Sequence, residues 1–382
     1  MNDITIDKTG WKKWRFDEFA QNISERVEPS QTDMDVYVGL EHIDPDTLHL
    51  SRYGHPSDVE GTKLRFYKGD IIFGRRRAYQ RKTALATTNG ICSAHAMVLR
   101  AKEDVVDPSF FPFLFHSKQF IDMAITISVG GLSPTINWKD ISKQEFLLPP
   151  KSEQKRLAEL LWAADEMIEK EKQSFKLIEN LYLSTISSIF KNQKKYCDLG
   201  ALCSIKSGYA FPIKYQGNKD MPIPFLKVSD MNNLNNKYEI QVSENYINES
   251  ILKSIKGQVF PVGSLVFPKI GATIHTDKKR LLSIESVVDN NIMVLIPIKE
   301  LLDSYFLFYF FNTFKLADII NTGAVPTISA ETVRNIQIPE LDFEEQKNIV
   351  KKIDSIVLTI KQQDQLIGQS QQVKLALVNK IF

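Results

Sequence analysis

Two long segments of the chain place apolar residues at alternating steps of four and three positions. The first segment carries Leu157, Leu161, Ile168, Phe175 and Ile178, and the second carries Ile349, Ile353, Ile356, Ile360 and Ile367. Such steps follow one face of an α-helix, so each segment predicts a helix of about 38 residues, or roughly 57 Å. The two seams share one heptad register without an insertion, which favours two helices packed on each other.

Each seam also carries a polar residue at the same place, Glu171 in the first helix and Gln363 in the second. A polar pair inside the interface would set its register, whereas a pair at the seam edge would fill a solvated gap, and both interpretations fit. Extra apolar residues lie one step beside the seam, at Leu160, Met167, Leu181, Leu366 and Val373. This wide stripe predicts a further packing partner. A two-fold relation between the halves favours antiparallel helices.

The chain repeats itself with a separation of 192 residues. Glu153-Gln154-Lys155 recurs as Glu345-Gln346-Lys347, and Ile189-Phe190 recurs as Ile381-Phe382. Upstream of each helix the matches continue, but their separation varies, so elements are kept while loops change length. We therefore expect a globular domain at 1–150, a helix at 151–191, a second globular domain at 192–340 and a second helix at 341–382.

Short apolar runs in the globular parts predict strands at Asp70–Phe73, Met97–Arg100 and Ser264–Phe267. The stretches Ser109–Ala124 and Leu301–Ile320 have helical spacing, and Asp342 with Glu345 predicts a capping box at the second long helix. The predicted fold class is α+β. It consists of two mixed α/β domains joined by two long helices packed as an antiparallel coiled coil, with an internal pseudo-two-fold repeat.

Composition narrows the function classes. The chain is 43% hydrophobic and 25% charged, and it has no apolar run long enough to span a membrane. The N-terminal segment lacks the apolar core of a secretory signal, and the three cysteines have no metal-ligand or disulfide spacing. These features predict a cytoplasmic protein without a structural metal.

No catalytic motif is present. The chain lacks the glycine-rich loops that bind dinucleotides or ATP, and its six histidines are scattered. Glu60 and Lys63, with Asp58 upstream, could form the carboxylate and lysine cluster of a nuclease, but this pattern is common by chance and is absent from the second half. We therefore expect neither catalytic residues nor a cofactor in this chain.

Basic residues instead gather in loops at matching positions of the two halves, although the net charge is only +2. The DNA-binding candidates of the first half are Lys63, Arg65, Arg75, Arg76, Arg77, Tyr79, Arg81 and Lys82. Those of the second half are Lys269, Thr273, His275, Lys278, Lys279 and Arg280, with Tyr209 and Lys214 in another loop. Lysine and arginine neutralise phosphate, and arginine can bind guanine bidentately. The alternative is a pair of solvated charged loops.

The order of motifs resembles the DNA-specificity subunit of type I restriction–modification systems. The resemblance rests on Leu148-Pro149-Pro150-Lys151-Ser152-Glu153-Gln154-Lys155, on Lys68-Gly69-Asp70-Ile71-Ile72-Phe73 and on Ser207-Gly208-Tyr209-Ala210-Phe211. It covers nearly the whole chain. The second copy departs from the pattern at Ile338–Glu344, which lacks the double proline.

The resemblance implies two target recognition domains, each of which reads one half of a split DNA site. The paired helices would set the spacing and dock two modification methyltransferase subunits. Those partners would use S-adenosylmethionine, and a restriction and translocase subunit would use ATP and Mg²⁺. Because the two loop sets differ, the half-sites should differ too. The alternatives are a coiled-coil scaffold protein with duplicated ligand-binding domains, or a nuclease.

Overall fold

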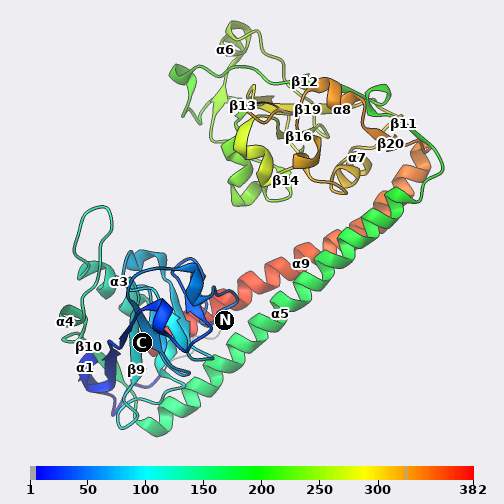
Figure 1. The fold of residues 1–382 in the computed structure, drawn as a ribbon. Coiled ribbons are helices and arrows are strands. Elements are labelled where there is room, and N and C mark those ends of the chain that lie inside the picture. The colour runs from blue at the N-terminus through cyan, green and yellow to red at the C-terminus, as the bar shows by residue number, and fades with distance from the viewer. Residues whose placement is uncertain (1–5, 322, 324) are drawn as a thin grey trace. The chain divides into compact units, whose positions relative to one another are not determined.

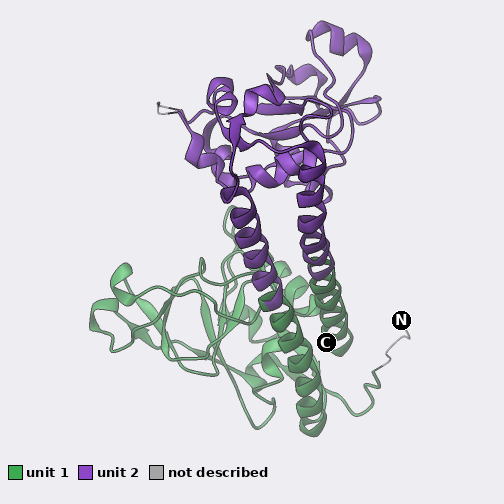
Figure 2. Cartoon of the chain, turned by 90° about the vertical axis from the view of Figure 1, so that its right-hand side faces the viewer, with its two compact units in different colours: residues 1–173, 364–382 green, residues 174–363 purple. Residues whose placement is uncertain are grey.

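The computed structural model describes residues 6–321, 323 and 325–382. The chain divides into two compact units, residues 1–173 with 364–382 (unit 1) and residues 174–363 (unit 2), as Figure 2 shows. Two long helices, α5 (Lys151–Lys191) and α9 (Phe343–Ile381), contribute residues to both units (Figure 1). The mixed α/β content of both units confirms that part of the predicted fold class. Within the described residues, no helix has an apolar stretch that would cross a bilayer.

Unit 1 is built on two four-stranded sheets and one strand pair. The first sheet has the order β2 (Ala20–Ile23), β9 (Met97–Ala101), β6 (Ile71–Phe73) and β7 (Thr83–Leu85), all antiparallel. The second sheet has the order β3 (Arg26–Val27), β5 (Lys63–Phe66), β8 (Gly90–Cys92) and β4 (Tyr37–Val38). β1 (Lys12–Arg15) pairs with β10 (Glu145–Leu148), and the short helices are α1 (Phe16–Phe19), α2 (Phe111–Leu114), α3 (Lys118–Thr126) and α4 (Trp138–Ile141).

Unit 2 repeats this plan. A five-stranded sheet has the order β12 (Cys203–Ser207), β19 (Ile292–Pro297), β16 (Leu265–Pro268), β17 (Arg280–Leu282) and β14 (Glu239–Ile240). A three-stranded sheet has the order β15 (Tyr246–Ile247), β13 (Ile223–Leu226) and β18 (Val287–Val288). β11 (Tyr196–Asp198) pairs with β20 (Gln337–Pro339), and the short helices are α6 (Glu249–Ser254), α7 (Ser304–Phe311) and α8 (Ala330–Arg334).

The main sheets of the two units match in register as well as in order. Ile71 lies opposite Leu99 in unit 1, and the equivalent Leu265 lies opposite Leu295 in unit 2. β6, β9 and β16 confirm the three predicted strands. The first stretch with helical spacing forms two short helices, because the hydroxyl oxygen of Ser117 caps α3 by accepting a hydrogen bond from the backbone N–H of Phe120 at 3.1 Å.

Each unit has a core that includes one end of each long helix. In unit 1, Leu157 and Leu161 from the start of α5 pack with Val378 and Ile381 from the end of α9, around a cluster of phenylalanines. In unit 2, Ile186 from the end of α5 and Ile353 from the start of α9 belong to the same core. Each core therefore contains the start of one long helix and the end of the other, and neither unit completes its core without both helices.

The predicted seam residues differ in how deeply they are buried. Leu157, Leu161, Ile168, Ile353 and Ile360 are buried. Glu171, Phe175, Ile178, Ile349, Ile356, Gln363 and Ile367 are half-buried. A layer of only two helices leaves the flanks of its seam open to water, so partial burial is expected where no sheet lies against it. At the polar position of unit 1, the carboxylate of Glu171 accepts a hydrogen bond from the Ser370 hydroxyl at 3.2 Å.

The repeated glutamine of the Glu-Gln-Lys motif ties the start of each long helix to its globular part. Gln154 is buried, and its side chain accepts from the backbone N–H of Asp107 at 2.7 Å and donates to the carbonyls of Val105 and Pro149. Three backbone groups that would otherwise be buried without partners are thus satisfied.

Gln346 repeats the arrangement in unit 2, with the Asp303 N–H and the carbonyls of Leu301 and Leu341. The predicted capping box at α9 is also confirmed. The Asp342 N–H donates to Glu345, and the Glu345 N–H donates to Asp342 at 2.8 Å.

We expect Gln154→Met to destabilise unit 1 by about 3 kcal/mol, because methionine keeps the length of the side chain and leaves a buried N–H and two carbonyls unpaired. All four tryptophans (Trp11, Trp14, Trp138 and Trp162) belong to unit 1, so tryptophan fluorescence during urea unfolding measures that unit. Gln346→Met is the matched control. It should destabilise unit 2, seen as faster hydrogen exchange in α7, with a smaller effect on the tryptophan transition. Equal urea midpoints of tryptophan fluorescence for Gln154→Met and wild type would show that Gln154 does not stabilise the attachment of α5 to unit 1.

Candidate nucleic-acid interface

The arginine-rich loop of unit 1 leaves β6 and returns to β7. Its ends meet where the Gly74 N–H donates to the carbonyl of Lys82 at 2.9 Å. Arg77 and Arg81 have left-handed backbone conformations, with φ of 57° and 55°, on either side of a short 3₁₀ turn. Non-glycine residues rarely adopt this conformation, so the surrounding contacts hold the loop in a defined shape.

A second segment, residues 129–135, holds this loop by its backbone. The Arg77 N–H donates to the Pro134 carbonyl at 2.7 Å, and the Ile136 N–H donates to the Arg75 carbonyl at 3.0 Å. The Ser133 hydroxyl accepts from the guanidinium groups of Arg76 at 3.1 Å and of Arg77 at 3.2 Å. The two segments therefore form one basic surface whose shape is set mainly by backbone hydrogen bonds.

The same backbone attachment occurs in unit 2 with different side chains. There the Gly271 N–H donates to the Pro326 carbonyl at 2.8 Å, and the Ile328 N–H donates to the Lys269 carbonyl at 2.9 Å. Thr273 and His275 are exposed in the loop that follows β16, and Asp277 adopts the left-handed conformation, with φ of 53°. Each unit thus presents a different set of side chains on an equivalent framework.

Several predicted DNA contacts in unit 1 have partners inside their own unit. Lys63 is buried and donates to the carbonyls of Glu60 and Gly61. Arg65 is paired with Asp33 at 3.1 Å, Arg81 is paired with Asp46, and Lys82 donates to the carbonyl of Leu40. These four cations are held by carbonyls or carboxylates of their own unit, whereas Arg77 and Tyr79 are exposed and Arg75 and Arg76 are half-buried beside them.

Unit 2 shows the same division. Lys279 is only 2% exposed and is paired with Asp277 at 2.9 Å, and the Arg280 guanidinium donates to the Asn236 carbonyl at 2.8 Å. Burial lowers the pKa of both side chains. Lys278 bonds to Asn232 and remains half-buried. Lys269 donates to the Ser207 hydroxyl at 2.7 Å, and burial lowers its pKa as well.

The two predicted residues of the other loop of unit 2 differ in exposure, since Tyr209 is half-buried and Lys214 is exposed. The Tyr209 ring stacks on Phe260 with a centroid distance of 6.2 Å, so it packs within the unit. Lys214 is exposed and lies over the Tyr215 ring at 4.7 Å. Gly208 is required here, because a Cβ atom would meet the carbonyl oxygens of Asp289 and Val288 at 2.2 Å.

The nuclease alternative has no supporting geometry. The Asp58 carboxylate accepts from the His55 backbone N–H at 2.7 Å, and Lys63 bonds to the backbone of Glu60 rather than to its carboxylate. In the part of the chain that the structure describes, no group of three or more histidine, cysteine or acidic residues is arranged to hold a metal ion.

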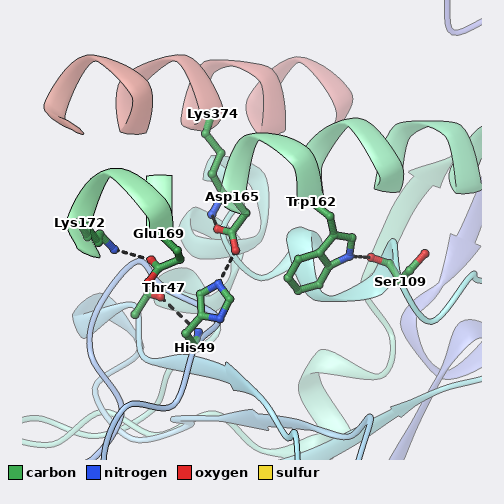
Figure 3. A network of polar contacts seen from close by, with 8 residues as sticks. All are labelled: Thr47, His49, Ser109, Trp162, Asp165, Glu169, Lys172 and Lys374. Atoms are coloured by element: carbon green, nitrogen blue, oxygen red, sulfur yellow. Dashed lines mark hydrogen bonds and ion pairs between the residues drawn. The ribbon is translucent and has the colours of Figure 1, made fainter. Parts of the chain in front are cut away.

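A polar network joins the globular part of unit 1 to both long helices (Figure 3). Asp165 of α5 is buried and bonds to Lys374 of α9 and to His49 from a loop, the latter at 2.5 Å. Nearby, the Trp162 indole N–H donates to the Ser109 carbonyl at 2.8 Å. Burial acts to raise the pKa of Asp165, but the hydrogen bonds and charges of His49 and Lys374 lower it to about 2. The network was not predicted.

Beside this network lies a cavity of about 580 Å³ in unit 1, lined by residues that include His116, Arg81, Glu169 and Gln371. His116 is buried, and its Nε2 atom has no hydrogen-bond partner among the described residues. Burial, then the charges of Lys374 and Arg81, lower its pKa to about 3, so this histidine is neutral near pH 7. At the equivalent place in unit 2, Asn312 donates to the Tyr182 hydroxyl at 3.2 Å.

Comparison with known proteins identifies relatives of the chain. The family model described as "Type I restriction modification DNA specificity domain" matches residues 57–180 and 192–369, which is more than half of the sequence. The type I restriction enzyme EcoDI specificity subunit of Escherichia coli is 29% identical over 189 residues, which make up 48% of this chain and 42% of that relative. The matched part of this chain thus spans less than half of that relative's length.

Two solved structures are similar over almost the whole chain. One comes from a study of complex assembly and conformational transition of the type I R-M system, with a TM-score of 0.62 and 18% identity, covering 98% of this chain and 97% of that one. The other is the type I restriction–modification system S subunit from M. genitalium, with a TM-score of 0.55 and 14% identity, covering 100% and 97%. At these identities, the similarity establishes the fold.

The network in Figure 3 should make the stability of unit 1 depend on pH through His49. The hydrogen bond to Asp165 raises the pKa of His49 above its ordinary value of 6.5. The folded state then binds this proton more tightly than the unfolded state, so the contribution of His49 is full below about pH 6.5 and is lost as the pH rises through the raised pKa. We expect His49→Gln to lower the tryptophan-detected urea midpoint at about pH 5.5 and to match wild type at about pH 9.

The lowered pKa of His116 gives the stability of unit 1 the opposite dependence on pH. Because His116 is present in both proteins, its effect cancels in the difference between variant and wild type. His55→Gln, which replaces an exposed histidine of the same unit, is the matched control. A constant difference between His49→Gln and wild type across this pH range would show that the proton on His49 does not contribute.

Proposed function

Because the chain belongs to the type I restriction–modification DNA specificity family, we propose that it is the non-catalytic subunit that reads the DNA sequence for a type I complex. Each unit reads one part of a bipartite, asymmetric site. Modification subunits that use S-adenosylmethionine, and a restriction and translocase subunit that uses ATP and Mg²⁺, carry out the chemistry. The complex acts on DNA in the cytoplasm, and two modification subunits bind one copy of this chain.

One observation carries the proposal. The loops that follow β6 and β16 are attached by equivalent backbone hydrogen bonds, but they present different side chains. Arg75, Arg76, Arg77 and Tyr79 in unit 1 take the place that Lys269, Thr273 and His275 hold in unit 2. Arginine can donate two hydrogen bonds to one guanine, whereas threonine and histidine have shorter side chains that make one hydrogen bond to a base. Two readers of different chemistry on one framework recognise two different half-sites.

The long helices support a spacing role. α5 has 41 residues and α9 has 39, so each is about 60 Å long if straight. In our proposal they pack as an antiparallel coiled coil related by a pseudo-two-fold axis, and they fix the distance between the half-sites. Readers mounted on such a scaffold can reach one side of a duplex when the half-sites lie about one helical turn apart.

Exposed aliphatic residues on the long helices support docking of the modification subunits. Leu160, Met167, Leu366 and Val373, which belong to the wide apolar stripe, are between 45% and 51% exposed in unit 1. A row of half-exposed aliphatic side chains on a long helix gains free energy when a partner covers it. The same surface would serve a scaffold protein, but the basic loops favour the DNA-reading function.

Changing the basic loop of one unit should affect one half-site only. We expect Arg76→Ala with Arg77→Ala to weaken binding to the preferred duplex about tenfold or more. The slope of log affinity against log salt concentration should fall in magnitude by about two, because two phosphate-neutralising charges are lost. Selection from a random duplex pool, with the full chain and its modification subunits, should return a site in which one half is degenerate.

Thr273→Ala with His275→Ala is the reciprocal variant and should make the other half degenerate. Lys118→Ala with Lys139→Ala removes the same charge from exposed positions of unit 1 outside the loop, and it should leave both halves intact. Loss of both half-sites in either loop variant, or binding without salt dependence, would contradict the proposal.

A further inference from the structure

The segment that holds the basic loop of unit 1 forms a small hairpin with an apolar tip. The backbone groups of Val129 and Thr135 hydrogen-bond to each other in both directions, at 3.0 and 2.9 Å. Between them, Gly130 adopts φ of 118°, a conformation that favours glycine and turns the chain. Leu132 lies at the tip and is 97% exposed, and Val129 is 67% exposed.

Unit 2 has the equivalent backbone pairing between Asn321 and Thr327. The Asn321 N–H donates to the Thr327 carbonyl at 2.8 Å, as the Val129 N–H donates to the Thr135 carbonyl in unit 1. Val325 precedes Pro326, as Ser133 precedes Pro134 in unit 1, and is 55% exposed. An exposed aliphatic side chain therefore stands beside the reading loop in each unit, although the two segments differ in sequence.

An isolated exposed leucine is ordinary on a protein surface, but the setting of Leu132 is specific. Its neighbour Ser133 accepts hydrogen bonds from Arg76 and Arg77, so the exposed leucine adjoins the residue that binds both cations. The backbone hydrogen bonds of Pro134 and Ile136 to the arginine loop fix the base of the hairpin. A partner that binds these arginines must therefore also accommodate the leucine.

We propose that Leu132 is a wedge that enters the minor groove of the bound duplex and partly separates two adjacent base pairs, while the arginine loop beside it crosses the backbone and reaches base edges in the major groove. This inference rests on the proposed DNA-reading function. Leucine cannot hydrogen-bond to a base edge, but its side chain leaves water when it slides between base planes. Proteins that kink DNA from the minor groove combine apolar wedges with neighbouring cations in this way.

The wedge adds sequence preference without a hydrogen bond to a base. Pyrimidine–purine steps separate at the lowest energetic cost, so the half-site read by unit 1 should contain such a step where Leu132 enters. In unit 2 the exposed aliphatic residue is Val325, which takes the position of Ser133 and has a shorter side chain than Leu132, so the other half-site should be disturbed less. Leu132 is therefore a specificity-determining residue outside the basic loop.

The test uses the full chain with its modification subunits and the duplex selected from a random pool. 2-Aminopurine, whose fluorescence rises when it unstacks, replaces single bases across the half-site of unit 1. We expect wild type to raise the fluorescence at one step, and Leu132→Ala to abolish that rise and weaken binding about tenfold, as expected when most of a buried leucine side chain is lost. Leu132→Met should retain both effects.

Leu234→Ala removes a leucine that is 89% exposed in unit 2, and it should leave the unit 1 step unchanged. The salt dependence of binding should be the same in wild type and Leu132→Ala, because no charge is lost. If wild type binds the duplex with salt dependence but no step unstacks, the wedge is overturned while the DNA-reading function stands.

A loss of affinity in Leu132→Ala without any fluorescence change in wild type would assign Leu132 to another contact. If deoxyuridine in place of thymidine then causes the same loss, the leucine touches a thymine methyl group in the major groove. If wild type shows no salt-dependent binding to any duplex, the proposed function fails as well.

Discussion

Each unit depends on one constraint, which is that its core must contain the start of one long helix and the end of the other. In unit 1, Leu157 and Leu161 share a core with Val378 and Ile381, and in unit 2 Ile186 shares one with Ile353. Deleting one residue from a helix would turn every following side chain by about 100° around its axis. This explains why the repeat keeps a separation of 192 residues through the helices and varies elsewhere. The buried glutamines Gln154 and Gln346 fix where each helix begins.

The two units share one fold but place side chains of different chemistry at equivalent positions. Unit 1 places a buried carboxylate, Asp165, between Lys374 and His49, and it leaves His116 against a cavity. Unit 2 fills the corresponding region with Tyr182 and Asn312, which bond to each other. A buried charge pair is sensitive to pH and to the loss of either partner, whereas a neutral tyrosine and asparagine are not. The two units are therefore alike in fold and unlike in electrostatics.

The sequence was informative where local periodicity or turn chemistry controls the structure. The heptad spacing of the long helices, the three strands and the capping box at Asp342 are all local signals. It was uninformative where a partner lies far away in the chain. Lys82 donates to the carbonyl of Leu40, and Lys279 donates to that of Phe314, so nothing in the local sequence separates these cations from Arg77. The hydrogen bond between His49 and Asp165 could not be predicted from local sequence either, because the two residues lie 116 positions apart.

The way the reading loops are attached explains how one framework can hold different readers. The contacts that fix their bases join backbone atoms, from Arg77 to Pro134 and from Gly271 to Pro326. Backbone hydrogen bonds do not depend on the identity of the side chain, so the exposed residues can change without a penalty to the fold. The buried cations do not share this freedom, since replacing Lys279 would leave the Asp277 carboxylate without its ion-pair partner. Differences in recognition between the two units should therefore concentrate at the exposed loop positions, such as Arg77 and Thr273.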